Sequence, residues 1–124
     1  MMKPRVIEDE NGRRRATSAC EKPCPIEDGM KILGGKWTGS ILWHLQYGPV
    51  RFNDLSRMIA AASKKMITER LRHLEAQGVV TREIINSSPI SVEYSLTERG
   101  KTALLFLDEL RKWTESIEPE LYGS

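Results

Sequence analysis

The sequence of 124 residues lacks several features that define large classes of protein. No apolar run approaches the roughly 18 residues that a membrane-spanning helix needs, so no membrane association is expected. The N-terminal stretch is charged and has no apolar core, which argues against a secretory signal peptide. Two cysteines are too few for a disulfide scaffold. These absences predict a small, soluble, cytoplasmic protein with one folded domain.

Patterns that carry catalysis or hold a metal are also missing. There is no glycine-rich phosphate loop, no pair of carboxylates on one helical face and no Ser/His/Asp arrangement. Cys20, Cys24, His44 and His73 lack the close spacing of a zinc site, and both histidines are expected on helix surfaces. Spacing alone does not exclude a Cys24 nucleophile with His44 as its base. The sequence nevertheless predicts no enzyme activity, no metal and no cofactor.

What the sequence does have is an uneven distribution of charge. Six basic and three acidic side chains lie between residues 51 and 77, a net charge of +3, whereas residues 97–124 carry four basic and six acidic ones, a net charge of −2. A basic middle and an acidic end indicate an anionic partner for the middle of the chain only.

The spacing of apolar residues and helix caps predicts helices along most of the chain. Residues 1–19 have no periodicity and carry three consecutive arginines, so they are expected to form a flexible arm. One helix is predicted from Pro25 to the Gly34-Gly35 pair, and a second over 36–48. Asn53 is expected to cap a short third helix, and Ser63 to cap a fourth that closes at Gly78.

Two strands and a long helix complete the pattern. Residues 79–85 are rich in β-branched side chains, residues 90–96 alternate apolar and polar side chains, and a polar tip lies between them. Thr97 is expected to cap a last helix with an apolar stripe that ends near Pro119. The order predicts an α+β, mostly helical fold, a winged helix-turn-helix over residues 20–124. The stripe is longer than one small core needs, so the N- and C-terminal helices are expected to form a homodimer.

The helix after Ser63 has an outward face suited to DNA. Ile67, Leu71 and Leu74 fall on one buried stripe at 100° per residue, and polar side chains occupy the opposite side. Such a face is also typical of simple solvation, but the tight turn before it and the predicted wing after it favour nucleic acid. The alternative is a winged-helix protein–protein module without DNA binding. The expected DNA-binding residues are Ser63, Lys64, Lys65, Thr68, Glu69 and Arg72 on this helix, and Arg82, Asn86, Ser87 and Ser88 on the wing.

Several segments together resemble the HxlR family of bacterial winged-helix transcription regulators, over about residues 23–115. They include C-P at the first helix, G-G-K-W, R-F-N-D-L, K-M-I-T-x-R-L-R-x-L-E and Y-S-L-T-x-x-G. The resemblance implies a homodimer on double-stranded DNA with a pseudo-palindromic operator, and a recognition helix at 63–77. It also matches Cys24 to an N-terminal cysteine through which some members sense oxidants or electrophiles. Residues 1–19 and Cys20 lie outside it.

The two cysteines, four positions apart, are open to several interpretations. Cys24 directly precedes the proline that begins a helix, where backbone N–H groups and the helix dipole favour a thiolate. Together with the resemblance, this position gives the hypothesis of a redox- or electrophile-sensing Cys24, with Cys20 as a resolving thiol. The alternative is that Cys24 is a small buried apolar residue. The sequence identifies no small-molecule effector.

Overall fold

The structure, a computed structural model, describes residues 6–16 and 23–122, and the chain divides into two units after Lys31. In the first unit, β1 (Val6–Glu8) pairs antiparallel with β2 (Arg14–Ala16). The Asp9 carboxylate closes the turn between them, because it accepts hydrogen bonds from the backbone N–H groups of Asn11 and Arg13, each at 2.9 Å. The sequence pattern did not indicate this hairpin within the predicted arm.

Helix α1 (Pro25–Leu33) begins in the first unit and ends in the second. Its first residue is a proline, as predicted, because the fixed φ of proline suits that position and its missing N–H is not needed there. The carbonyl of Cys24 accepts a hydrogen bond from the backbone N–H of Asp28 at 2.9 Å. Cys24 therefore stands at the start of this helix, as expected.

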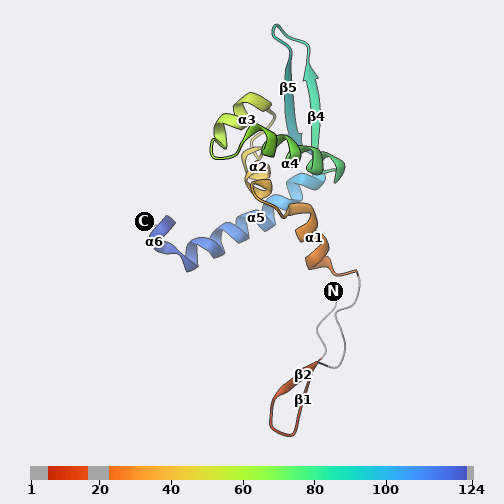
Figure 1. The fold of residues 1–124 in the computed structure, drawn as a ribbon, viewed down its shortest axis with the longest axis vertical. Helices are drawn as coiled ribbons and strands as arrows, with labels where there is room; N and C mark the ends of the chain where they lie inside the picture. The colour runs from red at the N-terminus through yellow and green to blue at the C-terminus, as the bar shows by residue number, and fades with distance from the viewer. Residues whose placement is uncertain (1–5, 17–22, 123–124) are drawn as a thin grey trace. The chain divides into compact units, whose positions relative to one another are not determined.

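The second unit is a winged helix-turn-helix domain (Figure 1). Its three-stranded antiparallel sheet has the order β3-β5-β4, and the β4–β5 hairpin extends beyond the helices as the wing. The elements are α2 (Thr38–His44), β3 (Val50–Arg51), α3 (Phe52–Met58), α4 (Lys64–Ala76), β4 (Val80–Ile85), β5 (Ser91–Leu96), α5 (Glu98–Ile117) and α6 (Pro119–Tyr122).

The core of this domain lies where α2, α3 and α4 meet the base of the wing. The stripe predicted on α4 is confirmed, since Ile67, Leu71 and Leu74 are all 0% exposed. Side chains from the other elements close around it, among them Ile41, Leu42, Leu45, Leu55, Val80 and Tyr94. A fully buried leucine or isoleucine contributes roughly 1.5–3 kcal/mol, so this stripe fixes α4 firmly to the domain.

Three of the predicted helix signals are confirmed. The Ser63 hydroxyl accepts a hydrogen bond from the Met66 N–H at 3.1 Å, and the Thr97 hydroxyl accepts one from the Gly100 N–H at 3.1 Å. Each satisfies a backbone donor that a helix start leaves without an intrahelical partner. Gly78 follows α4 with a φ of +74°, the left-handed conformation that glycine adopts without strain.

Other expectations at element ends and surfaces were wrong. Helix α3 begins at Phe52 and not after Asn53, because Val50 and Arg51 form a third strand opposite Tyr94 and Glu93. The second helix spans only Thr38–His44, not 36–48: Trp37, with a φ of 74°, precedes it and turns follow it. On β5, Tyr94 is buried. Ile90, expected on the same strand, lies just before it and is exposed, because that end of the wing lies beyond the helices.

The two histidines are half-buried on their helices, and each ring contacts a backbone carbonyl. His73 on α4 is half-buried, with Nε2 at 3.1 Å from the carbonyl oxygen of Ile32. His44 is also half-buried, with Nδ1 at 2.7 Å from the carbonyl oxygen of Ser40. Both are therefore partly exposed, as expected for helix flanks. The ring of His44 contacts a carbonyl of its own helix, whereas that of His73 contacts a different helix, which helical spacing does not show.

The end of α4 packs directly on the start of α5. A Cβ atom on Gly100 would lie 2.1 Å from the carbonyl oxygen of Val79, so only glycine fits there. The Thr97 hydroxyl donates to the carbonyl of Gly78 at 2.7 Å, and the Arg99 guanidinium donates to that of Gln77 at 3.1 Å. This close packing explains why a glycine stands inside α5.

Candidate nucleic-acid interface

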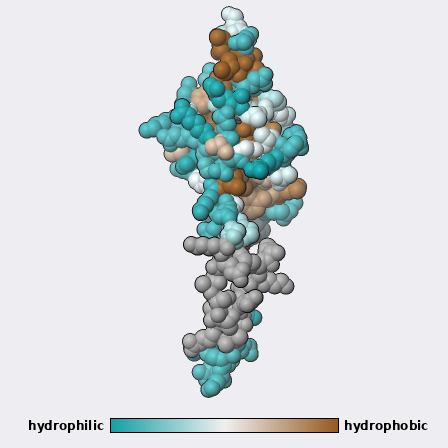
Figure 2. All heavy atoms as spheres, turned by 90° about the vertical axis from the view of Figure 1, so that its right-hand side faces the viewer, coloured by the Kyte–Doolittle hydropathy of each residue, from teal (hydrophilic) through white to brown (hydrophobic). Residues whose placement is uncertain are grey.

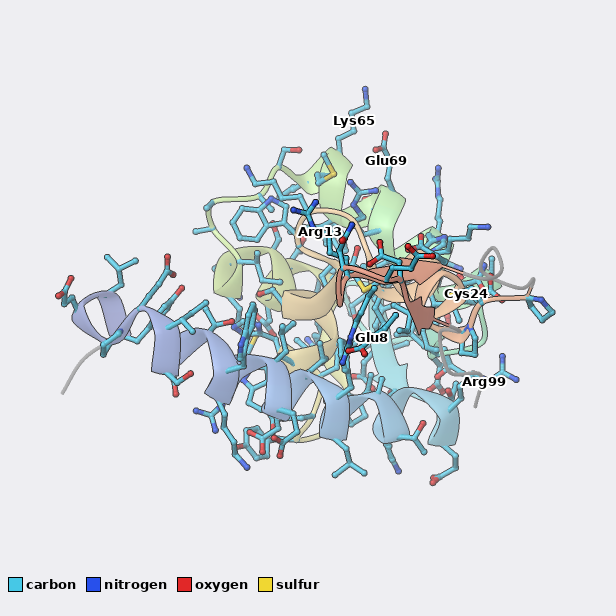
Figure 3. The ribbon with its side chains drawn as sticks, turned by 90° about the horizontal axis from the view of Figure 1, so that it is seen from below. Glu8, Arg13, Cys24, Lys65, Glu69 and Arg99 are labelled. Atoms are coloured by element: carbon cyan, nitrogen blue, oxygen red, sulfur yellow. The ribbon has the colours of Figure 1, made fainter. Side chains whose placement is uncertain are left out.

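The outward face of α4 carries charged side chains along its length. Lys64, Lys65, Glu69 and Arg72 are all exposed, while the opposite stripe of the same helix is fully buried. Figure 3 shows Lys65 and Glu69 extending in the same direction, away from the body of the domain. Lysine and arginine suit phosphates and guanine edges, and a glutamate can accept a hydrogen bond from cytosine. This face is therefore chemically able to contact DNA.

Two hydroxyl groups on this helix already take part in local hydrogen bonds. Ser63 accepts the Met66 N–H, which leaves its own O–H free to donate to a phosphate. The half-buried Thr68 donates its O–H to the carbonyl of Lys64 at 2.8 Å. Thr68 can then only accept a hydrogen bond or offer its methyl group, a group that fits the methyl of thymine.

The flanks of α4 are fixed by hydrogen bonds to the segment before α2. Arg70 donates from Nε to the carbonyl of Lys36 at 3.0 Å. Its guanidinium packs over Gly35, where a Cβ would lie 3.1 Å from Cζ. The contact between His73 and the Ile32 carbonyl acts in the same way. Arg70 is thus a positioning residue, and it was not singled out from the sequence.

The predicted wing residues lie in two separate places. Arg82 is exposed on β4, opposite Tyr94 in the sheet register. It lines a cleft that also includes Thr68 of α4. Asn86, Ser87 and Ser88 are exposed at the tip, where the Ser87 hydroxyl donates to the Pro89 carbonyl at 2.8 Å. The structure therefore brings Arg82 close to α4, whereas Asn86, Ser87 and Ser88 do not line that cleft.

Two further arginines belong to this surface and were not predicted. Arg51 and Arg57, one before and one within α3, line the same cleft as Arg82. Both contribute to the excess of positive charge between residues 51 and 77. That excess of positive charge was the only signal in the sequence. It does not show which arginines face α4.

A second exposed surface, on α5, is apolar. Phe106, Leu110, Trp113 and Ile117 follow one another at helical spacing, and each is exposed, Trp113 to 60%. The C-terminal end of α5 extends, with α6, away from α3 and α4 (Figure 1). An apolar cleft of about 310 Å³ runs beside this stripe, between Trp43 of α2, Leu110 and Arg111 of α5, and Tyr122 of α6.

The described residues contribute only one of the two cysteines. Cys24 is half-buried directly before α1, and Cys20 lies outside the described residues. Within residues 6–16 and 23–122, no three His, Cys, Asp or Glu side chains are grouped closely enough to bind a metal ion. Over the same residues, no helix is long and apolar enough to cross a membrane.

Comparisons with known proteins agree with this geometry. The model of the HxlR-like helix-turn-helix family matches residues 32–121. The HTH-type transcriptional regulator YybR of Bacillus subtilis is 41% identical over 93 residues, which cover 75% of this chain and 74% of YybR.

Two solved structures of regulators are also similar. The redox regulator HypR in its reduced form is 38% identical, with a TM-score of 0.73 over 80% of this chain and 98% of that one. The reduced form of the transcriptional regulator YodB from B. subtilis is 35% identical, with a TM-score of 0.67 over 74% of this chain and 91% of that one.

Proposed function

Because the chain belongs to the HxlR-like helix-turn-helix family and is a transcriptional regulator, we propose that it binds double-stranded DNA sequence-specifically as a homodimer. The observation that carries this proposal is the division of α4 into a stripe that is 0% exposed and a face of exposed donors. A helix held this firmly can enter a major groove without moving in its own domain. Arg72 would read a base edge, and Lys65 would contact phosphate.

The homodimer is proposed from the exposed apolar stripe of α5. Four large apolar side chains, Phe106, Leu110, Trp113 and Ile117, face solvent in the single chain, a cost that a second copy would remove. Ile26 and Met30 of α1 are exposed as well, and they support a contribution from the first helix. A two-fold dimer would present two α4 helices to successive major grooves, about 34 Å apart, on a pseudo-palindromic site.

The test begins with selection of genomic DNA fragments by the purified protein, followed by titration of the selected duplex. Arg72→Ala should cost about 1–3 kcal/mol of binding free energy and relax preference at one base. Lys65→Ala should weaken all sequences alike and lower the salt slope by about one. Lys101→Ala removes the same charge on α5, where Lys101 pairs with Glu98, and serves as the matched control.

A winged-helix module that binds protein and not DNA is the alternative, and the same titration separates the two. Such a module would show negligible affinity for any duplex at low salt. If the parent binds a selected site but the Lys65 and Arg72 variants bind it equally well, α4 is not the recognition helix.

We further propose that DNA binding responds to oxidants or electrophiles through Cys24, with Cys20 as a resolving thiol. Two observations support this: the place of Cys24 at the start of α1, and the similarity of the chain to HypR, a redox regulator. Modification of Cys24 would shift α1, which carries exposed apolar side chains of the proposed dimer interface.

The switch is tested by operator binding before and after mild diamide or quinone treatment of the parent, Cys24→Ser and Cys20→Ser. Treatment should change binding by the parent and leave Cys24→Ser unaffected. Cys20→Ser should respond to quinone but lose the diamide-induced disulfide. Unchanged binding by the treated parent, with an alkylation profile at the free-thiol pKa of about 8.5, would make Cys24 structural.

A further inference from the structure

Apolar side chains of the second unit are exposed both on the wing and on α5. Figure 2 shows apolar atoms gathered just below the tip of the wing, where Ile84 and Ile90 are exposed. On α5 the exposed stripe differs in one respect, because an apolar cleft of about 310 Å³ runs beside it, between α2, α5 and α6. Small-molecule sites in proteins have volumes of roughly 300–1,000 Å³, so this cleft is large enough for a compact ligand.

The lining of this cleft is apolar and partly aromatic. Gly39 of α2 and the buried Leu107 of α5 come close together in it, since a Cβ on Gly39 would lie 3.3 Å from Cδ2 of Leu107. Trp43 of α2 and Tyr122 of α6 add two aromatic rings to the lining. Aromatic rings attract one another in offset and edge-to-face arrangements and bury a large apolar area. The lining therefore favours an aromatic ligand.

Two hydroxyl groups in the lining offer one hydrogen-bond acceptor and one donor. The Thr114 hydroxyl donates to the carbonyl of Leu110 at 2.9 Å, so its oxygen is left to accept. Nδ1 of His44 donates to the carbonyl of Ser40 at 2.7 Å and therefore carries a hydrogen atom. The Ser40 hydroxyl, 3.4 Å from the same nitrogen, is thus left to donate elsewhere. A hydroxyl group on the ligand can accept from Ser40 and donate to Thr114.

The charges beside the cleft disfavour an anion. Arg111 contributes a guanidinium group to the lining, but it forms ion pairs with Asp108 at 2.9 Å and with Glu115 at 2.8 Å. Lys112 pairs with Asp108 as well and with Glu109. These two cations and three carboxylates leave a net charge of −1 on this side of α5. A neutral ligand is therefore favoured over a carboxylate.

We propose that this cleft is an effector site for a neutral, hydroxylated aromatic molecule of one or two rings. Its lining joins two parts of the domain: Ile41 and Leu42 of α2 lie in the core that holds α4, and α5 carries the stripe of the proposed dimer. A ligand between α2 and α5 changes the position of α4 relative to the dimer axis, and so changes operator binding. This consequence rests on the proposed function, whereas binding of the ligand does not.

Binding is tested by calorimetric titration of the full chain with three probes: 2-naphthol, 2-methoxynaphthalene, which cannot donate a hydrogen bond, and the anion 2-naphthoate. The parent should bind 2-naphthol, and the other two probes about tenfold more weakly. Thr114→Val keeps the shape of the side chain and removes the acceptor. It should weaken 2-naphthol by about tenfold and leave 2-methoxynaphthalene unchanged. A parent that does not bind 2-naphthol, or a Thr114→Val variant that binds it equally well, would overturn the proposal.

Two further variants locate the ligand and identify a competing occupant. Tyr122→Ala truncates an exposed lining residue and should weaken both neutral probes. Tyr47→Ala is the matched control, because Tyr47 is 94% exposed and does not line the cleft. If 2-naphthol binds Trp113→Ala but not the parent, a second copy of the chain fills the cleft in the dimer, and the effector site is ruled out.

Titration of the selected operator tests the regulatory role. Saturating 2-naphthol should change the operator affinity of the parent by about fivefold or more, and the same concentration should affect Thr114→Val much less. Unchanged operator affinity with the cleft filled would overturn its role as an effector site. If the parent binds no duplex but still binds 2-naphthol through Thr114, the proposed function has failed and the ligand site stands.

Discussion

Helices α4 and α5 differ in how far their apolar side chains are buried. On α4, Ile67, Leu71 and Leu74 are completely buried within the chain, and the exposed face is mostly charged. On α5, Leu107 is buried, but Phe106, Leu110 and Trp113 are exposed. The two helices are joined at one end, where Gly100 packs against the carbonyl of Val79.

This difference indicates two kinds of partner. A helix whose apolar stripe is buried in its own domain presents only its polar face. The basic side chains on that face suit an anionic partner. A helix whose apolar stripe is exposed can bury it against another apolar surface. A second copy of the chain offers an identical surface. The close packing at Gly100 links both surfaces, so the proposed dimer would set the distance between two copies of α4.

The largest effect is expected on stability, when the buried stripe of α4 is truncated. Leu71→Ala should lower the free energy of unfolding by about 2–5 kcal/mol, because it leaves a cavity in a fully packed core. Chemical denaturation measures this directly. Leu105→Ala on α5, where the side chain is 77% exposed, is the matched control and should change the stability of the single chain very little.

The next effect concerns association. Trp113→Ala should weaken the homodimer by about 2 kcal/mol or more, since large aromatic residues dominate many interfaces. Sedimentation at micromolar concentration should then show a shift from dimer toward monomer, with the thermal stability of the monomeric domain unchanged. A parent chain that is already monomeric at that concentration would contradict the proposed role of the α5 stripe.

Breaking the junction between the two helices should have a smaller but distinct effect. Gly100→Ala should destabilise the domain by about 1–3 kcal/mol, despite the better helix propensity of alanine, because its Cβ overlaps the Val79 carbonyl. Binding to single half-sites should then be less affected than binding to the full pseudo-palindrome. Equal stability of the variant and the parent would show that the two helices can separate without cost.

The smallest effect is electrostatic and lies on α5. Hydrogen bonds from Arg111 and then Lys112 lower the pKa of Asp108 below its ordinary value of 3.8. A lowered pKa in the folded state means that this pair stabilises the fold above pH 3.8, and that the stabilisation is lost as the pH falls through the lower folded value. Asp108→Asn should therefore reduce the melting temperature slightly at neutral pH, and the difference should vanish in strong acid.

Local chemistry explains which parts of the fold were predictable. Ser63, Thr97 and Gly78 act on the backbone within a few residues, so their roles at helix ends follow from the sequence. The strand at Val50 exists only because Tyr94, far along the chain, lies opposite it. The hydrogen bond of His73 likewise depends on the Ile32 carbonyl, 41 residues away. No local pattern contains either contact.

The same distinction applies to the candidate site. The face of α4 could be predicted because helical periodicity separates Lys65 and Arg72 from the buried stripe. Arg51 and Arg57 could not be assigned, since they lie on β3 and α3 and line one cleft with Arg82 only through the fold. A pattern within one helix shows its faces, whereas a cleft between elements is set by packing.

The central claim is that α4 presents a DNA-reading face on a two-fold dimer. The most direct measurement is a titration of a selected operator duplex and a scrambled duplex of equal length, with stoichiometry and affinity followed at several salt concentrations. The account predicts two chains per operator, binding about 10³-fold or more tighter than to the scrambled duplex, and affinity that falls as salt rises. Equal affinity for both duplexes, or no binding at low salt, would contradict it.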